Sequence, residues 1–121
     1  MSEYKLYNTA LERAVFRQLF PGNHGKFREY LLAHLGDDSF YYEPVQTAYN
    51  LLRLFVKKRG ELPDYGTLMS DSRMSPSTFD VVRNYALRED NPLFITSEKQ
   101  AKEAVDELHR LAYCRRIQRS L

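Results

Sequence analysis

The sequence has little of several features that mark common classes of protein. Its single cysteine, Cys114, excludes an internal disulfide and fits a reducing compartment. No apolar run approaches the length of a membrane span, and the first residues lack the apolar core of a secretory signal. The formal net charge is only +2, so global charge alone gives no case for nucleic acid. We therefore expect a cytoplasmic domain with no membrane partner.

Motifs for nucleotide, metal or nucleophilic chemistry are also missing from the sequence. There is no glycine-rich phosphate loop followed by Lys and Ser or Thr. His24, His34 and His109 lie far apart, with no cysteine or acid at ligand spacing. Cys114 has no nearby histidine to activate it as a nucleophile. We therefore predict no catalytic, metal or cofactor site in this chain and no enzymatic activity of its own.

Helix signals, by contrast, are abundant. Apolar residues repeat at spacings of three and four, and no alternation typical of a strand occurs. Thr9 and Glu12 are predicted to form a capping box, and Gly60 is predicted to be a helix C-cap. The expected helices begin at or near Thr9, Lys26, Pro44, Asp64, Pro76 and Ser97. The sequence thus predicts an all-α chain, with a small helical bundle over residues 1–72 and a C-terminal helical hairpin over residues 73–121.

The last helix of this hairpin is unusually long. At ~1.5 Å per residue, residues 97–121 would extend over roughly 36 Å, and the preceding helix is about half that length. The shorter helix cannot cover the longer one, so part of the apolar stripe lacks an obvious partner within the chain. Such a stripe usually marks an interface, which is the reading we favour. The alternative is that the stripe packs across the whole bundle.

The same helix ends in a run of basic residues. From His109 onward it carries four arginines and no acid: Arg110, Arg115, Arg116 and Arg119. At least two of them could face one phosphate backbone, so they are candidates for contact with nucleic acid or another domain. Cations in a last helical turn also complement the helix dipole without any further function.

A series of short motifs resembles the N-terminal domain of replicative DNA helicases of the DnaB family. The central motifs, in order, are Phe40-Tyr41-Tyr42-Glu43-Pro44, Ala48-Tyr49, Phe55 to Gly60, Pro63-Asp64 and Thr67-Leu68. Upstream, Glu12, Val15, Phe16 and Leu19 are similar to the opening helix of that family. Downstream, Asp106 to Arg116 is similar to its hairpin arm. The resemblance spans residues 9–121. Arg17-Gln18 in place of small glycines, and Val45 where many members have histidine, indicate a divergent member, of bacteriophage type.

This resemblance implies a role in DNA replication. In the family, N-terminal domains pair through helical hairpins, and three pairs form a collar on a hexameric ring. The collar supports motor domains that move on single-stranded DNA, and it receives primase or a helicase loader. The ATPase domain, with its ATP and Mg²⁺, is absent from this chain, so we expect the chain to be a fragment of the helicase.

The resemblance and the unmatched stripe together predict a dimer interface on the hairpin formed by residues 76–89 and 97–121. Its expected residues are Phe79, Val82, Tyr85, Val105, Leu108, Leu111 and Tyr113. On this hypothesis, Leu108→Asp dissociates the dimer and leaves the helices intact. Loss of all helical signal would instead make Leu108 a core residue.

Two other functions are compatible with the sequence. One is a small DNA-binding protein that uses the arginine-rich helix, for which binding would depend steeply on salt. The other is a bacteriophage adaptor or loader that mimics the helicase collar.

Overall fold

A computed structural model describes residues 6–20, 26–71, 73–88, 90 and 93–121 of the chain. Within these ranges the chain forms α-helices and no strand, which confirms the all-α class. The helices are α1 (Thr9–Leu19), α2 (Arg28–His34), α3 (Glu43–Arg59), α4 (Tyr65–Met69), α5 (Pro76–Leu87) and α6 (Glu98–Ser120). No helix in these ranges has the length and apolar character needed to cross a bilayer.

Polar side chains begin most of these helices by binding backbone N–H groups that have no partner within the helix. Asp64 accepts from Thr67 N at 2.7 Å, and Ser97 accepts from Gln100 N at 3.1 Å. At α1 the N-cap is Asn8, whose Oδ1 accepts from Leu11 N at 3.0 Å. The predicted Thr9–Glu12 capping box is therefore wrong, and the Glu12 side chain does not cap α1.

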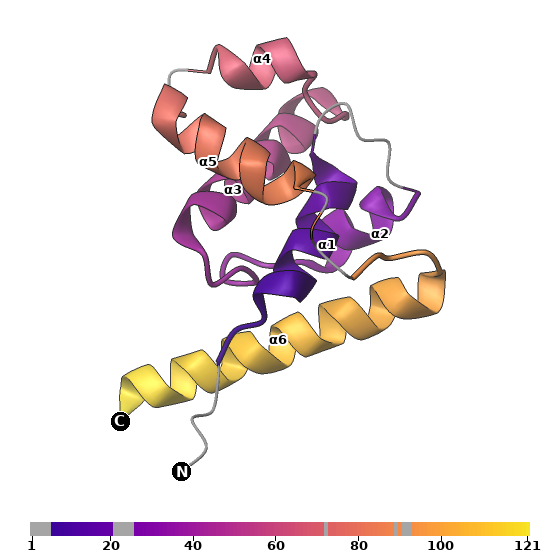
Figure 1. The fold of residues 1–121 in the computed structure, drawn as a ribbon, viewed down its shortest axis with the longest axis vertical. Helices are drawn as coiled ribbons and strands as arrows, with labels where there is room; N and C mark the ends of the chain where they lie inside the picture. Colours follow the sequence, from indigo (N-terminus) through magenta and orange to yellow (C-terminus); the bar gives the residue numbers. More distant parts are fainter. Residues whose placement is uncertain (1–5, 21–25, 72, 89, 91–92) are drawn as a thin grey trace.

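α1 is the central element of the fold. It contacts α2, α5 and α6, while α5 also packs on α3 and α6 also packs on α2. Figure 1 shows α6 lying across one end of the bundle, with α4 and α5 at the other end. One continuous apolar core joins all six helices, and Val15, Leu52 and Leu108 are fully buried in it.

The C-terminal helical hairpin predicted from the sequence is not formed. α5 and α6 are not among the principal packed pairs, and Figure 1 shows them apart, with α1 between them. The expected division into residues 1–72 and 73–121 does not separate two packing units either, because α5 packs on α1 and α3 of the first part. The physical reason is that the apolar faces of both helices find partners in the preceding helices.

Two arginines of α1 tie the C-terminal end of α5 to α1. Arg13 Nε donates to Tyr85 O at 3.0 Å, and Arg17 Nε donates to Ala86 O at 2.9 Å. Arg13 also pairs with Asp90 at 2.8 Å. The last carbonyls of a helix carry partial negative charge and need donors, so these guanidinium groups fix α5 against α1 rather than α6.

Gly60 ends α3 in the left-handed region, with φ of 78°. A side chain there meets no neighbouring atom, so the cost of Gly60→Ala is conformational only. We expect a loss of about 1 kcal/mol in the free energy of unfolding, measured by urea denaturation. Gly66→Ala, inside α4 and with only ordinary contacts, is the control and should stabilise the protein by about 0.5 kcal/mol. Equal effects of the two changes would contradict the assignment of Gly60.

Candidate functional site

The predicted dimer-interface residues lie mostly in the core of the chain itself. Five of them, Phe79, Val82, Val105, Leu108 and Leu111, are buried, with exposed fractions of 4% or less. Tyr85 is half-buried, its ring packs at a tilt against Tyr42, and its hydroxyl donates to Thr9 O at 3.4 Å. For these residues the interface prediction is wrong, because α1, α2 and α3 cover the faces that the sequence left without a partner.

Tyr113 is the exception among the predicted interface residues. It lies on the side of α6 that faces away from the bundle, and 58% of it is exposed. Ile117 and Leu121 follow at intervals of four residues and are 42% and 98% exposed. Residues four apart share one face of a helix, so Tyr113 and Ile117 form a short apolar stripe on the outer face of α6, and Leu121 directly follows the helix. This stripe is the clearest candidate contact surface on α6.

Arg115 is a structural residue rather than a free cation. Only 8% of it is exposed, on the inner face of α6. Its guanidinium donates to Leu6 O at 2.8 Å and to Asp38 O at 2.7 Å, and it lies over the Tyr41 ring. Burial lowers the pKa of Arg115, and the charges of Glu12 and Asp38 oppose that shift. Arg115 therefore joins α6 to two distant segments of the chain.

Glu12 completes the polar contacts on this side of the core. The residue is 1% exposed, and its carboxylate accepts hydrogen bonds from Tyr41 N at 3.0 Å and Tyr42 N at 3.3 Å. Both amides lie where the chain enters α3, so the negative charge sits at the positive end of that helix. Burial raises the pKa of Glu12 above its usual 4.5, against the effect of these bonds and of the Arg115 charge.

The raised pKa of Glu12 predicts how stability depends on pH. The folded state holds the proton more tightly than the unfolded chain, so the contribution of Glu12 is greatest below pH 4.5. It is lost as pH rises through the raised pKa. We expect the stability of the wild type, relative to the non-titrating Glu12→Gln variant, to fall between pH 4.5 and neutrality. Urea denaturation of both proteins across this range measures the difference, and a difference that rises with pH would contradict the assignment.

The other predicted basic contacts are mostly engaged within the chain. Arg110 Nε donates to the Glu107 carboxylate at 3.0 Å, and the Arg116 guanidinium pairs with the Asp38 carboxylate at 2.7 Å. Arg119 donates from Nε to Arg115 O at 3.3 Å and is exposed. Of these arginines, Arg119 alone has neither burial nor an acidic partner among the described residues. The four side chains do not converge on one open surface.

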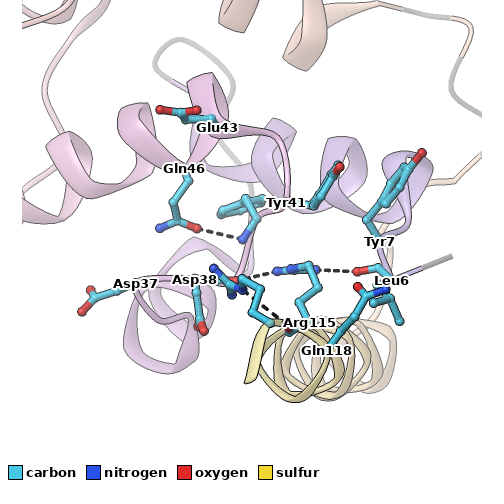
Figure 2. A pocket seen from close by; sticks show the side chains of 11 residues that line it. Leu6, Tyr7, Asp37, Asp38, Tyr41, Glu43, Gln46, Arg115 and Gln118 are labelled. Atoms are coloured by element: carbon cyan, nitrogen blue, oxygen red, sulfur yellow. Dashed lines mark hydrogen bonds between the residues drawn. The ribbon is translucent and has the colours of Figure 1, made fainter. Parts of the chain in front are cut away.

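A groove of about 550 Å³ opens beside Arg115, between the C-terminal half of α6 and the segment that leads into α3. Figure 2 shows it from close by, with the end of α6 on one side. The rings of Tyr7 and Tyr41 stack in this groove, with their centroids 4.2 Å apart. Acidic and basic side chains both line the groove. The lining residues are Leu6, Tyr7, Asp37, Asp38, Phe40, Tyr41, Glu43, Gln46, Arg115, Gln118 and Arg119. This mixed lining suits contact with a protein side chain more than binding of a polyanion.

Neither the stripe nor the groove holds a recognisable metal centre. No group of three or more His, Cys, Asp or Glu residues that could hold a metal ion occurs in the described part of the chain. The sequence reasoning missed Glu12 and Arg115 as buried polar residues, because it assigned Glu12 to a capping box and Arg115 to a nucleic-acid contact. Comparisons with protein-family models, with curated proteins and with solved structures find no match to this chain.

Proposed function

We propose that this chain is the N-terminal collar domain of a DnaB-like replicative DNA helicase and acts by protein contact. The observation that carries the proposal is the exposed apolar stripe of Tyr113 and Ile117. It lies on α6, the helix whose sequence resembles the hairpin arm of that family. Exposed apolar side chains gathered on one helix face are typical of surfaces that bind other proteins.

The structural roles of the resembling motifs support the proposal. Phe40 packs edge-on against Phe16 in the core, and Pro44 lies in the first turn of α3. Gly60 ends α3, and Asp64 begins α4. Leu68, the last residue of the motif series, is fully buried. Residues that begin, end and pack helices are those that a shared domain fold would retain.

On this proposal the chain assembles with itself and with replication proteins. Copies of the domain pair and form a collar on a hexameric ring, and the collar binds primase or a helicase loader. ATP and Mg²⁺ belong to the motor domain, and single-stranded DNA is bound through the complete helicase. The alternative of a small DNA-binding protein gains little support, because Arg110, Arg115 and Arg116 are engaged within the chain.

The full-length product of the gene that encodes this chain provides the test. We expect a particle with the mass of a hexamer, and ATP hydrolysis that is stimulated by single-stranded DNA. A product without ATPase activity that binds a separate ring helicase would replace the proposal with the adaptor alternative. A monomer that neither hydrolyses ATP nor binds such a helicase would overturn both.

A further inference from the structure

A second groove lies between α2 and α3, on a part of the surface that the proposed function does not use. These two helices are not among the principal packed pairs, which leaves room for a groove of about 360 Å³ between them. This α2–α3 groove shares no residue with the apolar stripe of Tyr113 and Ile117. Any partner that it binds is therefore held at a separate site.

Aliphatic side chains form much of the wall of the α2–α3 groove. Leu32 comes from α2, and Leu54 and Val56 come from α3. All three are only partly buried, so some of their apolar surface stays in contact with water. Covering that surface with an apolar side chain of a partner removes it from water, which is favourable.

Two cations on α3 also line the α2–α3 groove. Arg53 and Lys57 are four residues apart, so their side chains lie on the same face of the helix. Lys57 is exposed and has no acidic partner among the described residues. The groove therefore has positive charge on α3 beside its apolar wall.

The acid that lines the groove, Asp37, is only weakly held by Arg53. Its Oδ1 lies 2.7 Å from Arg53 Nη1, but 92% of the Asp37 side chain and 40% of the Arg53 side chain are exposed. An ion pair this open to water adds little stability and is easily exchanged for another. Asp37 therefore marks the position that a carboxylate of a partner would take on Arg53.

We propose that the α2–α3 groove binds a short acidic segment of another protein, in which one apolar residue stands between two acids. Arg53 and Lys57 are about 6 Å apart along the axis of α3, and alternate residues of an extended chain are about 6.6 Å apart. The two acids can therefore pair with the two cations, the first of them displacing Asp37. The residue between the acids points to the opposite side, toward Leu32 on α2.

The lining favours a protein segment over a nucleic acid. Binding of a phosphate backbone depends on many cations, whereas this groove has Arg53 and Lys57 with Asp37 beside them. A phosphate backbone also has no apolar side chain to cover Leu32 and Leu54. An acidic segment with an apolar residue satisfies both the charge and the apolar wall.

An NMR titration of the isotope-labelled chain with a synthetic peptide tests this site, because it detects weak binding and locates it. The probe is a short peptide with the motif Glu-Leu-Glu between glycines. We expect changes in the amide resonances of Leu32, Arg53 and Lys57. Lys57→Glu should weaken binding about tenfold, because it sets like charges together. Asp37→Asn should strengthen binding about threefold, because it removes the acid that competes for Arg53.

Lys102→Glu is the matched control, since it makes the same charge reversal at an exposed site on α6, and it should leave the affinity unchanged. Absence of binding, an equal loss in Lys102→Glu, or weaker binding by Asp37→Asn would each overturn the proposal. So would a Glu-Gly-Glu peptide that binds as tightly as the probe. A single-stranded oligonucleotide that binds the same residues more tightly would replace the protein segment with a nucleic acid. None of these outcomes depends on whether the chain is part of a helicase.

Discussion

Leu108→Asp is expected to unfold the chain. Leu108 is fully buried on the inner face of α6, where α1 and α2 pack. Removing the leucine alone costs roughly 2–5 kcal/mol, and placing a carboxylate there costs several more. A domain of this size has only about 5–15 kcal/mol of total stability. We therefore expect loss of the helical circular dichroism signal and of a cooperative thermal transition.

Asp106→Leu is the matched control for this change. It lies two residues away on the exposed face of α6, so we expect it to keep the helical signal and a cooperative transition. The dimer hypothesis drawn from the sequence expected the opposite for Leu108→Asp, namely a helical monomer. A helical Leu108→Asp protein with a wild-type thermal transition would place Leu108 on the surface and contradict the fold.

Arg115→Met is expected to cost about 3 kcal/mol in the free energy of unfolding, because three buried or half-buried groups lose their partner. Leu6 O and Asp38 O lose a charged donor, and the carboxylate of Glu12 loses a neighbouring cation. Methionine keeps most of the aliphatic length, so the packing of the stem against the core changes little. Urea denaturation at neutral pH measures the loss.

Arg119→Met makes the same chemical change one turn later, at an exposed position. We expect it to alter the free energy of unfolding by less than about 0.5 kcal/mol. Similar losses for the two variants would show that a general charge effect, and not the contacts of Arg115, holds this end of α6.

Local signals in the sequence were sufficient to locate most of the helices. Asp64 and Ser97 each cap the helix that they were expected to begin, α5 begins at Pro76 as expected, and Gly60 ends α3 in the left-handed conformation. These assignments succeed because a cap depends on a few residues next to it in the chain. The α1 cap failed by one residue, since Asn8 and Thr9 are both good caps and only the fold decides between them.

The partner of α6 could not be predicted in the same way. Apolar spacing identifies the buried face of a helix, but it does not say which element covers that face. The sequence reasoning compared α6, with 23 residues, only with α5, with 12 residues, because the two are neighbours in the chain. In the fold, α1 and α2 cover α6 instead, which corresponds to the packing alternative that the sequence also allowed.

The burial of Arg115 and Glu12 could not be predicted from the sequence for a related reason. Arg115 bonds to carbonyls 77 and 109 residues away, and Glu12 bonds to amides 29 and 30 residues away. A charged residue on an amphipathic helix is ordinarily exposed, so neither side chain stood out as a core residue. Only the tertiary arrangement brings the start of α3, the segment before α1 and the last turns of α6 to one place.

The mass of the isolated chain in solution tests the central claim most directly, namely that it works by protein contact through the outer face of α6. Light scattering at high micromolar concentration should give a mass well above 14.3 kDa for the wild type. Ile117→Lys, which places a charge in the exposed apolar stripe, should return the mass to that of one chain with the helices intact. A wild type that stays at 14.3 kDa at every concentration would contradict this account.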